Sequence, residues 1–143
     1  MTVKAILSHK GPDVVTIEPS AKLADAIGIL AEKRIGALLI TGKTGEVAGI
    51  LSERDIVLTL ARAGAGGLDE TVEKVMTRKV FTCSVSDTVS QIMEQMTAGK
   101  FRHVPVVEDG VLVGVVSIGD VVKYRLQEIE HESNALRDYI LTA

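Results

Sequence analysis

The chain has 143 residues, of which 46% are hydrophobic and only 3% are aromatic. Its 16 basic and 19 acidic residues give a net charge of −3, which argues against the strongly basic domains that bind nucleic acid. The scarcity of rings also disfavours proteins that bind single strands by stacking bases on aromatic side chains. The one cysteine, Cys83, excludes an internal disulfide and a metal site made of several cysteines.

No apolar run in the sequence approaches the roughly 20 residues of a membrane-spanning helix. The first residues lack the long apolar stretch of a signal peptide. The three histidines stand apart from one another and from any carboxylate cluster. We therefore expect a soluble cytoplasmic protein with no metal site, no membrane contact and no nucleic-acid partner.

The sequence repeats itself, and a repeat has to be recognised before individual elements are assigned. Four segments recur in the same order, at 14–17 and 80–83, 23–33 and 89–99, 35–40 and 101–106, and 49–55 and 114–120. The offset between the two copies changes at the glycine turn of residues 42–45, which indicates an insertion in the first copy.

Each copy predicts the same succession of elements. A short β-rich segment comes first, and Ser20 or Ser86 is then a candidate N-cap for a helix with apolar residues at helical spacing. Two strands joined by a glycine-containing turn follow, and a second helix begins after Ser52 or Ser117. In chain order, the predicted helices and strands of the two copies are helix 23–33, strands 37–41 and 47–51, helix 89–99, and strands 103–107 and 111–116.

Strands flanked by helices predict an α/β (α+β) fold. Two pseudo-symmetric units should pack sheet to sheet and share a core, because one unit of about 60 residues is marginal alone. We divide the chain into a first repeat at 1–66, a second repeat at 67–124 and a C-terminal helix at 125–143. The glycine-rich segment 61–67 is expected to be a mobile hinge. The C-terminal helix carries an interrupted apolar stripe, which predicts docking on the other repeat or on a second subunit.

The pattern Gly-x-x-Ser-x-x-Asp stands at the end of a predicted strand in both copies, at 49–55 and 114–120. A helix N-terminus favours anions through its free N–H groups and its dipole. The serine could donate to a phosphate, the aspartate could accept from a ribose hydroxyl, and the glycine would let a ligand approach the backbone. The same spacing also suits a plain capping box. On spacing alone, both interpretations stay open.

The two motifs, together with the strand Arg102-His103-Val104-Pro105-Val106-Val107, resemble a pair of CBS (cystathionine β-synthase) domains, a Bateman module. The resemblance implies two β-α-β-β-α repeats related by a pseudo-twofold axis. It implies adenosine derivatives as ligands in clefts between the sheets: AMP, ADP, ATP or NAD(H), with S-adenosylmethionine less favoured. Pairs of this family commonly dimerise, so a homodimer is expected.

The resemblance also assigns roles to residues of both copies. Asp55 and Asp120 would bind ribose hydroxyls, and Ser52 and Ser117 would bind phosphate. The first strand of each repeat would line the adenine pockets, with Val15, Thr16, Ile17, Phe81, Thr82 and Cys83. The remaining candidates for ligand contact are Val104, Pro105 and Gly119, with Arg102 and His103 facing the phosphates.

The two copies are not equivalent in charge. Arg54 lies between the serine and aspartate of the first copy, and Arg102-His103 of the second copy replaces Gly36-Ala37 of the first. We hypothesise that Arg54, Arg102 and His103 converge on one phosphate region, since arginine offers phosphate a rigid fork of donors. One of the two sites would then be weaker or differently occupied.

These features predict a regulatory module that senses an adenine nucleotide and transmits a change of conformation or assembly to an effector protein. An enzyme is not expected, because His103 has no nucleophile and no orienting partner. Cys83 lies in an apolar strand and is expected in the core, and Arg78-Lys79 is interpreted as a solvated pair in a turn. The alternative is a constitutive structural or dimerisation module without a ligand.

Overall fold

The computed structural model describes residues 1–11 and 13–142. The helices at residues 23–33 and 89–99 have the predicted bounds, and the four long strands begin at the predicted residues. The elements in chain order are α1 (Val3–Lys10), β1 (Thr16–Ile17), α2 (Leu23–Lys33), β2 (Ala37–Thr41), β3 (Val47–Ser52), α3 (Glu53–Ala63), the 3-10 helix η1 (Gly64–Asp69), α4 (Val72–Val75), α5 (Val89–Gly99), β4 (His103–Glu108), β5 (Val111–Ser117) and α6 (Ile118–Thr142).

The strands form two small sheets, one in each copy of the repeat. β1 pairs in parallel with β2, which pairs antiparallel with β3, and β4 pairs antiparallel with β5. The counterpart of β1 in the second copy is shorter than predicted, because it is reduced to one parallel bridge between Cys83 and Val106. The Cys83 N–H donates to the Pro105 carbonyl at 3.0 Å, and the Cys83 carbonyl accepts from Val107 at 2.9 Å.

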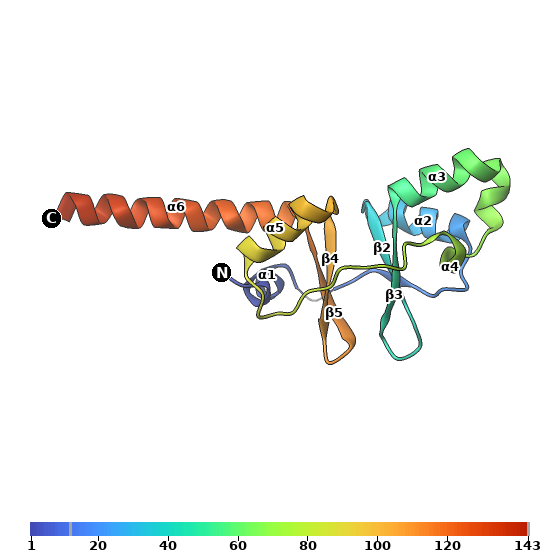
Figure 1. The fold of residues 1–143 in the computed structure, drawn as a ribbon, viewed down its shortest axis with the longest axis horizontal. Helices are drawn as coiled ribbons and strands as arrows, with labels where there is room; N and C mark the ends of the chain where they lie inside the picture. The colour runs from blue at the N-terminus through green and yellow to red at the C-terminus, as the bar shows by residue number, and fades with distance from the viewer. Residues whose placement is uncertain (12, 143) are drawn as a thin grey trace.

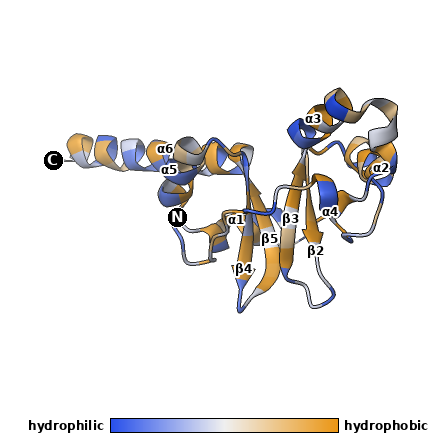
Figure 2. Ribbon diagram, turned by 45° about the vertical axis from the view of Figure 1, so that its right-hand side comes forward, coloured by the Kyte–Doolittle hydropathy of each residue, from blue (hydrophilic) through white to orange (hydrophobic). Residues whose placement is uncertain are grey.

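The two hairpins stand side by side in the middle of the molecule, with the helices outside them (Figure 1). Helices α2, α3 and α4 cover the hairpin β2–β3, whereas α1, α5 and α6 cover β4–β5, and the turned view agrees (Figure 2). Near the hairpin tips, the Leu112 N–H donates to the Gly45 carbonyl at 3.1 Å. The predicted α/β fold of two units packed sheet to sheet, with a C-terminal helix, is confirmed.

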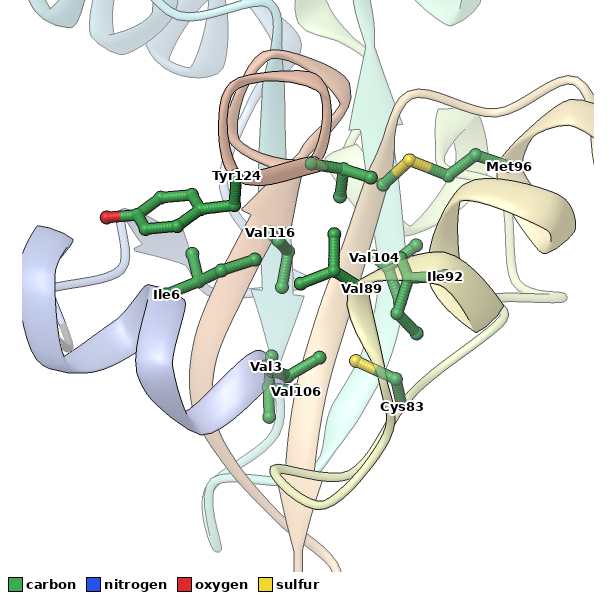
Figure 3. Close-up of a cluster of buried hydrophobic side chains, with 11 residues drawn as sticks. Val3, Ile6, Cys83, Val89, Ile92, Met96, Val104, Val106, Val116 and Tyr124 are labelled. Carbon is green, nitrogen blue, oxygen red and sulfur yellow. The ribbon is translucent and has the colours of Figure 1, made fainter. Parts of the chain in front are cut away.

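The buried side chains form two cores rather than the shared core that we expected. The core of the second copy includes Val3 and Ile6 of α1, which are fully buried against α5, β4 and β5 (Figure 3). The core of the first copy includes Val72 and Met76, from α4 and the residue after it. Helix α1 precedes the first copy in the chain but completes the core of the second copy, whereas α4 precedes the second copy but completes the core of the first. A division at residue 66 therefore separates both helices from the cores they complete.

The motif glycines Gly49 and Gly114 lie beneath these crossing segments. A Cβ atom at Gly49 would lie 2.6 Å from the Met76 sulfur and 2.8 Å from the Thr77 carbonyl oxygen. A Cβ atom at Gly114 would lie 2.7 Å from the Leu7 side chain. The glycines thus let another part of the chain approach the strand, which corrects the interpretation that they make room for a ligand.

Two local expectations are also corrected. Thr88, not Ser86, caps α5, because its partner Gln91 completes a capping box, whereas the residue three positions after Ser86 is apolar. Helix α2 likewise begins after Lys22 and not at a cap by Ser20. The expected hinge 61–67 is helical throughout, since its first residues end α3 and the rest begin η1.

We predict that Gly49→Ala destabilises the fold by about 1–3 kcal/mol, because the new methyl group collides with a backbone carbonyl. Gly28→Ala is the matched control: nothing lies within 4 Å of that position on α2. Alanine there should stabilise the protein by about 0.5–1 kcal/mol. Urea-induced unfolding measures both changes, and equal stability of Gly49→Ala and the wild type would contradict the close-approach explanation.

Candidate functional site

The junction between strand and helix in each copy is held by a serine–aspartate pair. Ser52 Oγ accepts from the Asp55 N–H at 3.4 Å, while Asp55 Oδ2 accepts from the Ser52 N–H at 2.9 Å and from its hydroxyl at 3.0 Å. Ser117 and Asp120 make the same three bonds at the start of α6, at 3.2, 2.9 and 3.0 Å. The capping interpretation is therefore right for both motifs. Capping occupies Oδ2 of each aspartate and leaves Oδ1 for a further partner.

A cavity of about 500 Å³, here called the Asp55 cleft, lies between the two repeats. The first repeat contributes the beginning of β2 and the first turn of α3. The second repeat contributes residues 100–103, just before and at the start of β4. The connecting segment between α4 and Cys83 supplies the remaining wall, with Thr77 and Phe81.

Positive charge dominates the Asp55 cleft. Two carboxylates, Glu53 and Asp55, line it together with four cationic side chains, which are Arg54, Lys79, Lys100 and Arg102. Arg54, Arg102 and His103 do come together on its walls, as the hypothesis of one phosphate region requires. Their role in binding stays a prediction.

The pseudo-symmetric counterpart, here called the Ser117 cleft, has a volume of about 410 Å³. Val15, Ser117 and His103 line it, so His103 borders both clefts. Its charged side chains are fewer: Lys10 and Arg34 stand against one carboxylate, Asp13. The second cleft is therefore less cationic than the first.

The two aspartates also differ in their partners. Asp55 Oδ1 accepts from the neutral Thr77 hydroxyl at 3.0 Å. Asp120 Oδ2 instead accepts from the Lys10 ammonium at 2.6 Å, and Lys10 also donates to the Val115 carbonyl at 3.0 Å. Burial raises the pKa of Asp120, but the bonds from Lys10 and Ser117 outweigh it and hold that pKa below its usual range. Asp120 is thus already paired with a cation, whereas Asp55 is not.

The surroundings of His103 favour its neutral form. Burial lowers the pKa of His103, and the charges of Lys10 and Arg102 lower it further, against the opposite effect of Asp120 and Glu53. The imidazole is therefore a hydrogen-bonding group between the clefts rather than a fixed positive charge.

Two phenylalanine rings border the Asp55 cleft. Phe81 and Phe101 stack with their centroids 5.5 Å apart at an interplanar angle of 23°. Phe81 remains 39% exposed, so part of its side chain is accessible from the cleft side of the stack. These two rings are half of the aromatic Phe and Tyr residues in the chain.

Eight of the sequence-predicted contact residues line neither cleft. They are Thr16, Ile17, Thr82, Cys83, Val104, Pro105, Gly119 and Asp120. Asp120 borders a separate hollow beside Lys10 and Tyr124. Val104 and Cys83 point into the core because neighbouring residues of a strand face opposite sides. Burial, with repulsion from Asp87 and Glu108, raises the pKa of the Cys83 thiol to about 12, so this buried thiol stays protonated.

Sequence reasoning missed several lining residues. Arg78 and Lys79 are both exposed, as expected, but they do not lie in a turn, and Lys79 also lines the Asp55 cleft. Arg78 donates to the Glu73 carbonyl at 3.2 Å. Arg34 and Lys100 occupy equivalent positions, each in the left-handed conformation that ends the first helix of its repeat. The recurrence of a basic residue at this point in both copies is the signal that could have found them.

A family model described as CBS domain matches residues 3–62 and again residues 72–127. The chain therefore belongs to the CBS domain family, and its two copies form a pair of such domains. The resemblance inferred from the motifs is confirmed.

Solved structures support the same assignment. The crystal structure of the CBS-domain containing protein ATU1752 from Agrobacterium tumefaciens is 48% identical with a TM-score of 0.83, over 87% of this chain and 92% of that chain. The CBS domain pair of protein MJ0100, in complex with methylthioadenosine and S-adenosyl-L-methionine, is 28% identical with a TM-score of 0.78. That match covers 90% of this chain and 98% of that one.

The curated relatives are longer proteins. CBS domain-containing protein CBSX3, mitochondrial, of Arabidopsis thaliana is 33% identical over 120 residues, which is 81% of this chain and 58% of the relative. CBSCBSPB5 of the same plant is 40% identical over 107 residues, only 19% of its own length. No helix within residues 1–11 and 13–142 combines the length and apolar character needed to cross a membrane.

We predict that His103 makes the protein less stable as the pH falls from about 7 to about 5. Its pKa in the folded state is lowered, so the unfolded chain binds the proton more readily. The stability that neutral His103 contributes is therefore present above the unfolded pKa of about 6.5 and is lost as the pH falls through that value toward the folded pKa. One such group changes the free energy of unfolding by at most about 1.4 kcal/mol per pH unit.

Urea-induced unfolding across this pH range measures the effect. His103→Gln should show a shallower dependence on pH than the wild type. His131→Gln, at an exposed position of α6, is the control and should keep the wild-type slope. If His103→Gln also keeps that slope, His103 does not titrate in this range.

Proposed function

We propose that the protein is a regulatory module that binds a phosphorylated adenine nucleotide in the Asp55 cleft. AMP, ADP, ATP and NAD(H) are the candidates. The observation that carries this proposal is the lining of the cleft, where one aspartate stands among four cations and beside two stacked rings. An adenosine-type ligand is supported by the MJ0100 domain pair, whose complex holds methylthioadenosine and S-adenosyl-L-methionine.

Each part of such a nucleotide has a counterpart in the cleft. The exposed part of Phe81, which lines the cleft, can contact adenine. Asp55 Oδ1, which the helix cap does not use, can accept from a ribose hydroxyl. Arg54 from the first repeat and Arg102 from the second can donate to the phosphates.

The charge of the cleft favours phosphates over a sulfonium ligand. S-adenosylmethionine carries a positive sulfonium group, which the surplus of cations repels, whereas the phosphates of ADP and ATP are attracted. S-adenosylmethionine is therefore the less favoured ligand for this chain, although it is bound in the MJ0100 complex.

The Ser117 cleft is proposed to fill at higher ligand concentration. A ribose hydroxyl that bound Asp120 would have to compete with Lys10, whose ammonium lies 2.6 Å from Oδ2. The cleft also has fewer cations for phosphates. The inequality of the two sites thus follows from the partner of each aspartate.

Signalling in this proposal is a population shift. A nucleotide held by Arg54 and Arg102 joins the two repeats, so it favours the arrangement in which both reach it. An effector protein then distinguishes the two arrangements, provided that the nucleotide binds them unequally. The proposal includes a homodimer and a cytoplasmic location, and it assigns the protein no catalytic reaction.

One observation favours a second candidate, a structural or dimerisation module without a ligand. Both Ser–Asp pairs form complete sets of capping bonds, so the motifs are explained without a nucleotide. Ligand binding distinguishes this candidate from the regulatory module.

We predict that ATP, ADP, AMP or NADH raises the thermal stability of the protein. A ligand at a hundredfold excess over its Kd stabilises the folded state by about 2.7 kcal/mol. S-adenosylmethionine and methylthioadenosine should have smaller effects. Differential scanning fluorimetry with each compound measures the shift, and no shift with any of them would support the structural module instead.

We predict that Arg54→Ala weakens nucleotide binding by tenfold or more, because a charge-assisted hydrogen bond contributes about 1.5–3 kcal/mol. Arg62→Ala is the matched control: this arginine lies on the same helix but pairs with Glu70 at 2.9 Å and does not line the cleft. Isothermal titration with ATP compares the variants. Unchanged affinity of Arg54→Ala would remove Arg54 from the proposed phosphate site.

A further inference from the structure

The distal part of α6 has no partner within the described chain. Val121 and Tyr124 are its last buried residues, and every residue from 129 to 142 is exposed. Figure 1 shows α6 running from the second repeat far beyond the rest of the molecule. Glu128 still pairs with the N-terminal ammonium of Met1 at 2.7 Å, so the stretch without a partner is residues 129–142, which at 1.5 Å per residue is about 21 Å long.

A helix of this length is marginal in water by itself. The charges along it do not compensate, because Glu130, Glu132 and Arg137 have no oppositely charged residue three or four positions away. Within residues 1–11 and 13–142, none of these three forms an ion pair. The distal part of α6 therefore lacks stabilising contacts within its own chain, and we expect them to come from another molecule.

Apolar residues form a continuous seam along this helix. They follow one another at alternating intervals of four and three residues, which is the heptad spacing of a coiled coil. The seam consists of Val122, Leu126, Ile129, Ser133, Leu136 and Ile140. Its apolar members are between 40% and 63% exposed, and Leu141 lies outside it. Ser133 is its one polar member, and a polar seam position restricts the register of two paired helices.

The charges beside the seam identify the partner. In the heptad abcdefg of this seam, the a positions are Leu126, Ser133 and Ile140. In a parallel pair of helices, the residue just before an a position faces the partner residue five positions further along the chain. Arg125 of one chain would then face Glu130 of a second copy, and Glu132 would face Arg137 of a second copy. Both pairs have opposite charge. Arg125 also binds Glu128 of its own chain at 2.9 Å, so Glu132–Arg137 is the pair without a competitor.

An antiparallel pair over the same stretch would be unfavourable. It would bring Glu130 of one helix opposite Glu130 of the other and place two glutamates at position 132 together. Parallel pairing in register is thus the arrangement in which the seam and the flanking charges agree.

We propose that residues 122–140 of α6 form a parallel, in-register, two-stranded coiled coil with a second copy of this chain. This interaction surface does not rest on the proposed nucleotide site, because none of its residues lines either cleft. The protein would dimerise through this surface with or without a ligand.

Disulfide trapping tests the arrangement directly. In a parallel, in-register pair, position 133 of one chain lies beside position 133 of the other, so Ser133→Cys should give a covalent dimer on mild oxidation. Asn134→Cys, one residue further and directed away from the seam, is the matched control and should give little dimer. Native Cys83 is buried in every variant. Equal trapping at both positions, or trapping at neither, would overturn the proposal.

Charge reversal tests the orientation. Glu132→Arg should raise the Kd of dimerisation several-fold in sedimentation equilibrium, and the double variant Glu132→Arg/Arg137→Glu should restore it. Asp138→Arg, on the outer face of the helix, should leave the Kd unchanged. A double variant that stays as weak as the single one would exclude the parallel register. Thermal unfolding of each variant checks that the repeats remain folded, and ATP titration of each separates this result from the nucleotide proposal.

Discussion

Met76 and Thr77 cross strand β3 at a distance that only a glycine at position 49 permits, and Leu7 crosses β5 above Gly114 in the same way. These crossings bring α1 and α4 into the cores of the opposite repeats, where their buried side chains complete the apolar packing. The segments that follow must then run between the repeats. They supply one wall of each cleft, so the clefts depend on these two close approaches.

The same carboxylate serves the fold and the proposed site. Asp55 and Asp120 each hold a strand–helix junction through Oδ2, and Asp55 also lines the Asp55 cleft. What differs is the second partner. A threonine hydroxyl leaves Asp55 available, whereas the Lys10 ammonium neutralises Asp120. A pair of copies with the same motif can therefore have unequal sites, because the inequality lies in residues that the motif does not contain.

Helix α6 connects two parts of the molecule with different roles. Its first turns belong to the core of the second repeat, where Val121 and Tyr124 are buried. Its start is capped by Asp120 beside the Ser117 cleft, and its distal seam is the surface proposed for a second copy. A continuous helix resists bending, so a rotation at its start would move the seam as a rigid unit.

Local patterns in the sequence were sufficient for much of the fold. Helices 23–33 and 89–99 and the starts of four strands followed from apolar periodicity and glycine turns, since these signals depend on neighbouring residues alone. The repeat predicted two related units, and the serine–aspartate spacing offered the caps as one of two interpretations, which the structure confirmed. The convergence of Arg54, Arg102 and His103 on one cavity could also be inferred, because the alignment of the copies places them at related ends of strands.

Other features were decided by tertiary structure. The sequence by itself determined the longer strands and the helices that recur in the two copies, the duplication and the family, all of which are encoded at short range or as recurrence. It did not show that α1 and α4 complete the opposite cores, that the motif glycines face Met76 and Leu7, or that Lys10 reaches Asp120. Each of these contacts joins residues that are far apart in the chain. Which residues meet depends on how closely the segments pack and on charges that approach one another only after the two repeats have come together.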